Sequence, residues 1–333
     1  MEKYISLAHG DGGELSHRLI KDVFIEAFGD GNEALFDAAA ITMSTNRIAV
    51  ATDSFVIKPI FFPGGSIGKL SVAGTVNDLA VSGAKPAYLT CSFVIEEGFL
   101  ISDLKKIVTD MASEAKKTSV TIVAGDTKVV ERGSADGVYI NTTGIGIYEN
   151  NNDCSFEFEE GDAIIVSGTI GDHGIAVLAA RGELGISTPI NSDCASLNKM
   201  LSEVLKSAEG VRIMRDPTRG GLATTLVEIA EDFQLTMKIN ERDLPVKKEV
   251  HGVCDLLGFD PLYLANEGKA IIVVTNRDKD KVIDILHEFP EGSDAVVIGS
   301  IIGKGKGQLL LETALGSKRL LTRLSGTMFP RIC

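Results

Sequence analysis

The sequence predicts an α+β protein of two domains followed by a short tail. Its 333 residues exceed what one hydrophobic core usually serves. In each half, short apolar strands alternate with amphipathic helical segments, and adjacent strands suggest antiparallel pairs. A polar run without periodicity at 150–153 separates the halves. We therefore expect domains at 1–150 and 155–316, and a mobile tail at 317–333 that ends in Cys333.

The composition excludes several classes of function. A formal net charge of −13 disfavours nucleic-acid and anionic-membrane surfaces, because both need clustered Lys and Arg. The first residues lack an apolar segment of signal-peptide length, and no uncharged run approaches a membrane span. The five cysteines are odd in number, widely spread and without a C-x-x-C pair, which fits neither a disulfide framework nor a zinc knuckle. We expect a cytoplasmic protein with no nucleic-acid or membrane partner.

The first half opens with a glycine-rich turn that contains Gly10, Gly12 and Gly13, followed by an amphipathic helical segment. Glycines before a helix let backbone N–H groups converge on an anion at the positive end of the helix dipole. A plain flexible loop fits this stretch equally. Ser66 is expected to cap the central helix of this half. The expected elements are strands at 47–52, 88–95, 120–124 and 137–147, and helices at 66–82 and 102–117.

Acidic residues occupy unusual places in this half. Asp53 follows the first strand, and Asn77 and Asp78 interrupt an otherwise apolar helix. A buried carboxylate there needs a cation or hydrogen-bond donors, because burial of a bare charge is expensive. The strand at 120–124 is expected to end in the run Gly125-Asp126, so that a second Asp stands at the end of a strand. Thr127 and Lys128 come next, and their side chains suit a phosphate and its metal.

The second half repeats the alternation of strands and helices. Asp216 precedes a proline and is therefore extended. Thr218 is expected to cap the helix that Arg219 and Gly220 open. Glu267 lies in a glycine-containing turn before a strand. The expected strands are 163–167, 235–239, 270–275, 295–302 and 308–312, and the expected helices are 175–181, 194–207, 219–232, 247–257 and 279–289.

Together these residues predict a site for ATP and Mg²⁺. Mg²⁺ prefers a few carboxylates plus nucleotide phosphates to a full protein cage. The site carries neither a Walker A loop nor a kinase signature. The alternative is that scattered Asp-Gly pairs are ordinary turns. The expected metal ligands are Asp53, Asp78, Asp126 and Asp216. The expected nucleotide contacts are Gly10, Gly12, Gly13, Asp53, Asn77, Asp78, Gly125, Asp126, Thr127, Lys128, Arg219 and Gly220.

The tail ends in a thiol beside a basic residue. Cys333 follows Arg331 by two positions, and chain ends are mobile unless something holds them. A nearby guanidinium could favour the thiolate or bind an anion. The alternatives are a frayed end that happens to finish in Cys, and prenylation, which instead requires Cys fourth from the end. The tail matters only if the rest of the chain builds a site that uses a delivered thiol.

Several motifs carry a resemblance to a known superfamily. They are Thr52-Asp53-Ser54, Val76-Asn77-Asp78-Leu79-Ala80, Gly125-Asp126-Thr127-Lys128, Asp216-Pro217-Thr218-Arg219-Gly220-Gly221 and Asn266-Glu267-Gly268-Lys269. The chain resembles the PurM-like superfamily of aminoimidazole-ribonucleotide (AIR) synthetase, which also holds selenophosphate synthetase and thiamine-monophosphate kinase. Within it, Ala8-His9-Gly10 and the terminal Pro330-Arg331-Ile332-Cys333 resemble the HypE family of hydrogenase maturation proteins.

The resemblance implies a reaction. Cys333 would receive a carbamoyl group from the carbamoyltransferase HypF, and ATP would then dehydrate the thiocarboxamide to a thiocyanate. The product would supply cyanide for the iron of [NiFe] hydrogenase, with the HypC–HypD complex as a further partner. Lys128 would offset charge on the transferring phosphoryl group, and Glu267 is the expected base, with His9 and His173 as weaker candidates. The resemblance also implies a homodimer that joins the first-domain sheets into a barrel.

Two other functions stay open from the sequence. A sister kinase or synthetase acting on a free small molecule would use the same ATP site without Cys333. A non-catalytic carrier would only shuttle the group on its tail. Selenophosphate synthetase is disfavoured, because the amino-terminal loop has no reactive Cys near its glycines.

Overall fold

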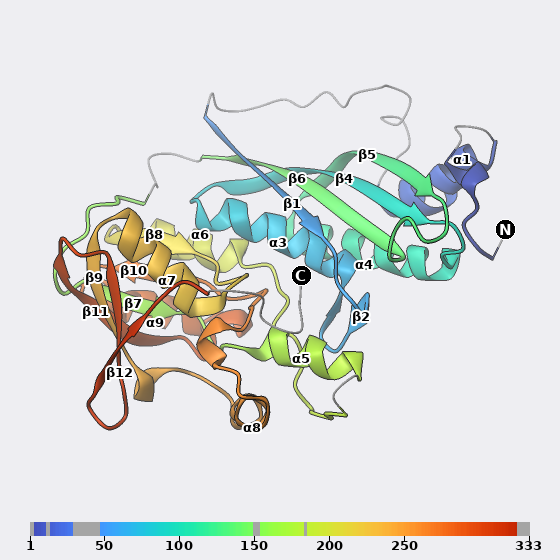
Figure 1. Ribbon diagram of the computed structural model, residues 1–333. Helices are drawn as coiled ribbons and strands as arrows, with labels where there is room; N and C mark the ends of the chain where they lie inside the picture. Colours follow the sequence, from blue (N-terminus) through green and yellow to red (C-terminus); the bar gives the residue numbers. More distant parts are fainter. Residues whose placement is uncertain (1–2, 11–13, 29–46, 149–153, 183–184, 325–333) are drawn as a thin grey trace.

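Two domains lie side by side in this computed structural model (Figure 1). The described residues are 3–10, 14–28, 47–148, 154–182 and 185–324. The predictions for Gly12, Gly13, the 150–153 linker and Cys333 lie outside these residues. Ahead of the first sheet the chain forms short helical turns, which are η1 (Leu7–His9), α1 (Glu14–Leu19), η2 (Ile20–Ile25) and α2 (Glu26–Phe28).

The first domain is a four-stranded sheet with helices on one face (Figure 1). Its strand order is β1-β6-β4-β5, where β4 and β5 are parallel and the other pairs antiparallel. The strands are β1 (Ile48–Phe55), β4 (Lys85–Glu96), β5 (Thr121–Val130) and β6 (Val138–Ile147). The helices are α3 (Ile67–Val81) and α4 (Ile101–Thr118), and a small hairpin of β2 (Phe61–Phe62) and β3 (Gly65–Ser66) precedes α3.

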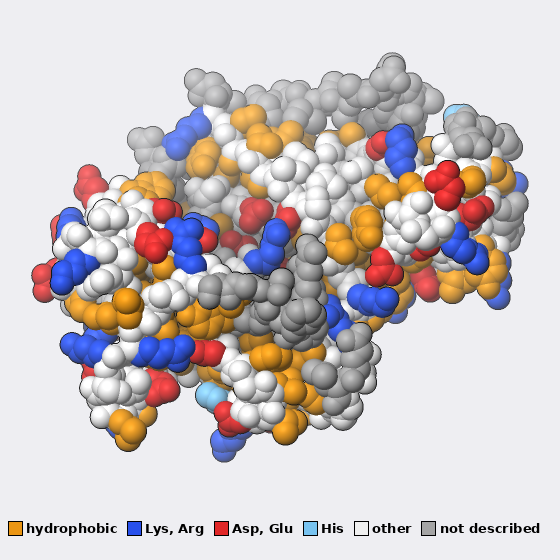
Figure 2. Space-filling model, in the orientation of Figure 1, with side chains coloured by type: hydrophobic (Ala, Val, Ile, Leu, Met, Phe, Trp, Pro, Cys, Tyr) orange, Lys and Arg blue, Asp and Glu red, His pale blue; other side chains and the backbone are white. Residues whose placement is uncertain are grey.

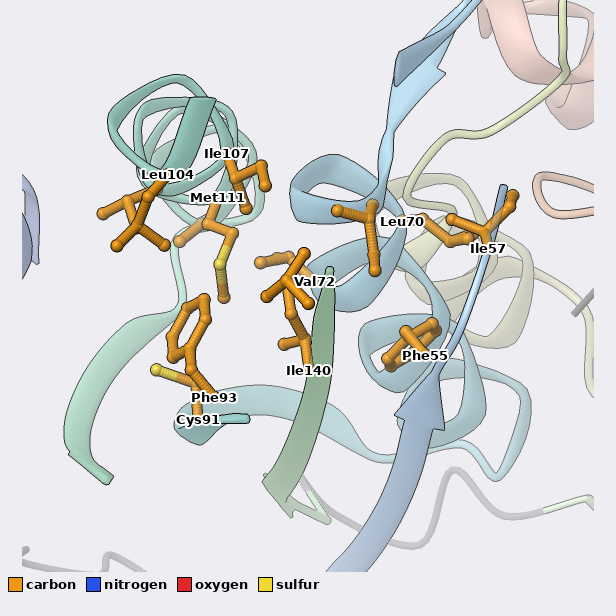
Figure 3. Close-up of a cluster of buried hydrophobic side chains, with 14 of the residues drawn as sticks. Phe55, Ile57, Leu70, Val72, Cys91, Phe93, Leu104, Ile107, Met111 and Ile140 are labelled. Atoms are coloured by element: carbon orange, nitrogen blue, oxygen red, sulfur yellow. The ribbon is translucent and has the colours of Figure 1, made fainter. Parts of the chain in front are cut away.

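The core of this domain lies between the helices and one face of the sheet. Burial alternates along β4 and β6, as the period of two in a strand requires. Figure 3 shows Phe93 of β4 pointing toward Met111 of α4, and Ile140 of β6 lying beside Val72 of α3. The opposite face of the sheet carries half-exposed and exposed side chains, so one face is open in the single chain.

Helix α3 is buried nearly all round. Only Lys69 and Asp78 of its residues are not classed as buried. The helix packs on the first sheet and also against α6 and β8 of the second domain. Ser66 accepts a hydrogen bond from the Lys69 N–H at 3.3 Å, which confirms the predicted cap. A helix enclosed by both domains explains why an apolar sequence without a polar face is stable there.

The second domain is built on a seven-stranded mixed sheet in the order β13-β12-β9-β11-β7-β10-β8. Its strands are β7 (Ala163–Val166), β8 (Val211–Arg215), β9 (Leu235–Asn240), β10 (Ile271–Val274), β11 (Val296–Lys304), β12 (Gln308–Glu312) and β13 (Lys318–Leu321). Its helices are α5 (Asp172–Arg181), α6 (Asn198–Ser207), α7 (Gly221–Asp232), α8 (Lys248–Leu257) and α9 (Lys279–His287), with short turns η4 (Glu241–Asp243), η5 (Pro261–Tyr263) and η6 (Pro290–Gly292).

Helices cover both faces of this sheet. Every residue of β7 and β10 is buried, which fits the continuous apolar runs of these strands. Side chains such as Ile164 pack in one cluster with α7, and their neighbours such as Ile165 pack in another with α6 and α9. The α+β fold with two domains is therefore confirmed. No described helix is long and apolar enough to cross a membrane.

Several local predictions are wrong. The strand expected to end at residue 124 continues to Val130, and β8 and β13 were not predicted. Helix α6 begins at Asn198 rather than 194. Thr218 does not cap α7, because Gly220 holds that position with a left-handed φ of 79°. Part of the predicted tail at 317–333 forms the edge strand β13.

Candidate functional site

Three of the four predicted metal carboxylates come together where the domains meet. Asp53 lies on β1, Asp78 on α3, and Asp216 directly after β8. Burial and the nearby charges of Asp216 and Asp53 raise the pKa of Asp78 to about 7, against opposition from Arg215 and Arg219. Burial also raises the pKa of Asp216. Carboxylates that repel one another in this way form a place where a cation would be stabilised.

Local structure fixes one side of this acidic cluster. Asp53 accepts a hydrogen bond from the Ser54 N–H at 2.8 Å, and its Oδ1 lies 3.7 Å from Nη2 of Arg219. Arg219 is 73% exposed, so this ion pair alone contributes little. Gly221 has a φ of 64°, and a Cβ there would lie 2.6 Å from the Leu262 carbonyl oxygen. Gly221 is therefore required for the close approach of this loop to the segment at 262–264.

Asp126 and Lys128 lie on the opposite face of the first sheet. Their partners in the parallel register with β4 are Ser92 and Val94, which point to the open face. The Lys128 ammonium lies 3.1 Å from Asp126, and both side chains are exposed. Within one chain, Asp126 does not join the acidic cluster, and the prediction that it ends a strand is wrong. Thr127, which lies between Asp126 and Lys128 in the strand, pairs with Phe93 and therefore points to the opposite face, the one covered by the helices.

The amino-terminal glycine turn begins against β5. A Cβ at Gly10 would lie 3.0 Å from Cβ of Val129, so the chain passes close over this strand. Gly125 on the same strand faces Cys91, whose carbonyl oxygen would lie 2.9 Å from an added Cβ. Both glycines are thus explained by close packing, and Gly10 lies beside the strand that carries Lys128.

Asn77 joins the two domains. Its Nδ2 donates to the Ala195 carbonyl at 2.9 Å, and its Oδ1 accepts from the Leu197 N–H at 2.8 Å. The side chain is 2% exposed. Both ends of the amide therefore bind the backbone of the second domain, a role that the sequence did not indicate.

The turn that carries Glu267 is held from two sides. Asn266 is buried, accepts a hydrogen bond from the Gly171 N–H at 2.8 Å and donates to the Pro217 carbonyl at 3.0 Å. Since Pro217 follows Asp216, this bond places the Glu267 turn beside the loop of the acidic cluster. On the other side, the backbone N–H groups of Glu267 and the next residue donate to Asp193.

The two histidines considered as bases are both buried. His9 contacts Ser6 through Nδ1 at 2.9 Å. His173 Nδ1 lies 2.8 Å from Oγ of Ser192, and its Nε2 has no hydrogen-bond partner among the described residues. Burial lowers the pKa of His173 to about 3, so this ring is neutral and weakly basic at pH 7. His173 is therefore a poor match for a general base.

No group of three acidic, His or Cys side chains among the described residues stands close enough to hold a metal by itself. Mg²⁺ is commonly bound by one or two carboxylates plus substrate phosphates. The donor chemistry at Asp53, Asp78 and Asp216 therefore fits a magnesium ion that arrives with a nucleotide. Figure 2 shows acidic and basic side chains together in the centre of the face where the domains meet.

The fold and this site define a protein of the AIR synthase-related class. The family described as "AIR synthase related protein, N-terminal domain" matches residues 36–148, and the corresponding C-terminal domain matches residues 159–312. A solved thiamine-monophosphate kinase from Stenotrophomonas maltophilia, 18% identical with a TM-score of 0.62, covers 95% of this chain and 99% of its own and shares the fold alone.

Relatives that match over their full length identify the family within this class. Carbamoyl dehydratase HypE of Escherichia coli K12 is 43% identical over 99% of both chains, and that of Rhodobacter capsulatus is 43% identical over 100% of this chain and 99% of its own. A crystal structure of HypE in complex with ATP has a TM-score of 0.93, with 44% identity over 98% of this chain and 99% of its own. A HypE–HypF complex has a TM-score of 0.80, with 47% identity over 92% of this chain and 99% of its own. The chain belongs to the HypE family.

Proposed function

We propose that this chain is an ATP-dependent carbamoyl dehydratase that converts a carbamoylated Cys333 to a thiocyanate. The product supplies the cyanide ligand for the iron of [NiFe] hydrogenase. The observation that supports the proposal is the hydrogen bond from Asn266 to the Pro217 carbonyl, because Asn266 precedes Glu267 and Pro217 follows Asp216 of the acidic cluster. The names of the full-length relatives support the reaction.

The acidic cluster is the proposed site of Mg-ATP. Asp53, Asp78 and Asp216 would hold Mg²⁺ together with the nucleotide phosphates, and the ion would offset charge on the transferring phosphoryl group. Arg219 and the Gly220 turn would face the phosphates, and the HypE–ATP structure supports nucleotide binding. Asn77 would act here by fixing the second domain beside Asp78.

The reaction balances with ATP as the only co-substrate. The carboxamide oxygen attacks the γ-phosphorus, a new P–O bond forms, and the bond to ADP breaks. One N–H proton leaves as the imidate phosphate forms. The C–O bond then breaks, phosphate leaves with that electron pair, and loss of the second N–H proton completes the C≡N bond. Phosphorylation is needed because the oxygen of an amide is a poor leaving group.

Glu267 is the proposed base for the N–H proton. Its side chain is buried, and its backbone is fixed on both sides, as a positioned proton acceptor requires. His173 is the weaker candidate, since the pKa of its ring is lowered to about 3.

A homodimer is the proposed assembly. The open face of the first sheet exposes apolar side chains, including Val50 at 62% and Ile48 at 46%. A second copy covering this face would bury them. It would also let Asp126 and Lys128 serve the partner's nucleotide, since they lie on the opposite face of the sheet from their own acidic cluster.

The proposed protein partners are HypF, which would load Cys333, and the HypC–HypD complex, which would receive the cyanide group. The HypE–HypF structure supports the first. In this proposal, domain 1–150 binds ATP and forms the dimer contact, domain 155–316 adds Asp216, Arg219 and the Glu267 turn to the site, and the tail at 317–333 carries the modified Cys333.

The variant Asp78→Asn tests the dehydratase against a carrier. The chain is loaded by HypF and carbamoyl phosphate, freed of nucleotide and then given Mg-ATP. We expect the unmodified chain to lose one water from its Cys333 adduct and Asp78→Asn to remain as the carboxamide. A variant that loses water at the unmodified rate would mean that Asp78 does not serve the reaction.

A further inference from the structure

A short segment of the second domain lies along the first domain. We call residues 192–198 the bridging segment. It connects to the hairpin of β2 and β3, to α3 and to α4. Its hydrogen bonds to the first domain are Ser192 N to Pro63 O (2.8 Å), Asn77 Nδ2 to Ala195 O (2.9 Å), Leu197 N to Asn77 Oδ1 (2.8 Å), Ser196 Oγ to Glu114 Oε1 (2.6 Å) and Asn198 Nδ2 to Thr118 O (3.1 Å).

The same segment holds the turn of the proposed base. Asp193 Oδ1 accepts from the Glu267 N–H at 3.1 Å, and Asp193 Oδ2 accepts from the Gly268 N–H at 3.2 Å. The Ala195 N–H donates to the Glu267 carbonyl at 3.3 Å. Three hydrogen bonds therefore fix the backbone on either side of the Glu267 side chain.

The bridging segment packs closely against the turn that carries Glu267. A Cβ at Gly268 would overlap the carbonyl oxygen of Asp193, so only glycine allows this approach. Burial raises the pKa of the Asp193 carboxyl, while the Lys269 ammonium and the two N–H donors oppose that rise. The Asp193 carboxylate thus faces a donor set built around it.

We propose that Asp193 is a positioning residue for the dehydration, acting through the backbone of Glu267. The bridging segment connects that turn to Asn77, the residue next to Asp78, so the proposed base and the proposed Mg-ATP site are held in one frame. This inference rests on the proposed function. The bridging segment would keep Glu267 at a fixed place relative to the phosphorylated carboxamide, and loss of the Asp193 carboxylate would remove two of the three hydrogen bonds that hold the turn to this segment.

The test compares Asp193→Ala and Asp193→Asn with matched variants of Asp278. Asp278 is a carboxylate of the same domain whose Oδ2 accepts from the Gly210 N–H at 2.9 Å, away from the Glu267 turn. Each variant is loaded on Cys333 by HypF and freed of nucleotide. The rate of water loss after addition of Mg-ATP is then followed by intact mass, with ATP affinity and melting temperature measured beside it.

We expect Asp193→Ala to load normally, to keep its ATP affinity and to lose water about 100-fold more slowly, the scale that a misplacement of about 1 Å produces. Asp193→Asn recovers part of the rate, because its amide oxygen still accepts one N–H. Asp278→Ala and Asp278→Asn lower the melting temperature but leave the rate unchanged. Three results for Asp193→Ala would overturn the proposal: water loss at the rate of the unmodified chain, water loss slowed only as much as in Asp278→Ala, or failure of HypF to load Cys333.

The double variant Asp193→Ala/Glu267→Gln checks the route of the effect. If Asp193 acts through Glu267, the double variant is no slower than Glu267→Gln alone. If instead the two single-variant rate losses multiply in the double variant, Asp193 does not act by positioning Glu267. An unmodified adduct that never loses water would instead refute the proposed function, whatever the Asp193 variants do.

Discussion

The ionisation of Asp78 opposes folding in the absence of metal and nucleotide. Burial and the charges of Asp216 and Asp53 raise the pKa of Asp78 from 3.8 to about 7. The folded chain therefore binds this proton more tightly than the unfolded chain does. The contribution of Asp78 to the free energy of unfolding falls as pH rises from about 4 to about 7, and then stays at its lower value. Asp78→Asn removes the charge at nearly constant shape.

The magnitude follows from the shift. About 3 pKa units at about 1.4 kcal/mol each give a penalty of up to about 4 kcal/mol above pH 7. Between pH 5 and pH 8 the penalty grows by about 3 kcal/mol, so the advantage of Asp78→Asn should grow by the same amount. This is large beside a total folding free energy of about 5–15 kcal/mol.

The assay is chemical denaturation of the Mg²⁺-free and nucleotide-free chain at both pH values. Asp126→Asn is the control, because it removes an exposed ion pair, which contributes about 0–1 kcal/mol. We expect Asp78→Asn to be the more stable chain at pH 8 and the less active one with Mg-ATP. The reasoning fails if Asp78→Asn is no more stable than the unmodified chain at pH 8, or if its advantage does not change with pH.

Three further results are expected. Mg-ATP affinity, measured by calorimetry, should fall about tenfold from pH 8 to pH 6, because Asp78 takes up a proton near pH 7. An affinity that does not change with pH would exclude Asp78 as a magnesium ligand. Asn77→Ala should lower the free energy of unfolding, measured by urea denaturation, by about 2–3 kcal/mol, because two buried hydrogen bonds are lost. A decrease below about 0.5 kcal/mol would contradict the role of Asn77 in joining the domains. Gly268→Ala should lower the melting temperature and leave the Cys333 adduct as the carboxamide, because the added Cβ would meet the Asp193 carbonyl. Gly252→Ala in α8 is the control: its Cβ has open space, so this variant should raise the melting temperature. Equal behaviour of the two variants would refute the close packing of Gly268 on Asp193.

Part of the site was predictable because unusual residues signal it locally. A carboxylate within an apolar helix, as at Asp78, indicates a cation or hydrogen-bond donors whatever the fold. Asp216 follows β8 as expected, whereas Asp53, expected after the first strand, lies within β1 because that strand continues to Phe55. The structure brings these three together. The terminal motif, which indicates the HypE family, carries information that no packing argument supplies.

The rest depended on tertiary contacts. The Gly125-Asp126 pair suggested the end of a strand, but the strand continues. The glycine is present because the carbonyl oxygen of Cys91 on the neighbouring strand lies 2.9 Å from where a Cβ would be. Asp193 was missed because it binds backbone groups 74 and 75 positions away and has no periodic pattern around it. The side-chain bonds of Asn77 to residues beyond the first domain were likewise invisible in the sequence.

The central claim is that the reaction takes place on Cys333 and consumes ATP. The most direct measurement is the intact mass of the HypF-loaded chain, freed of nucleotide, with and without Mg-ATP. The account predicts a carbamoyl adduct on Cys333 that loses one water only when Mg-ATP is present. No adduct on Cys333, with ATP still hydrolysed when a small molecule is added, would contradict it and identify a sister kinase or synthetase instead.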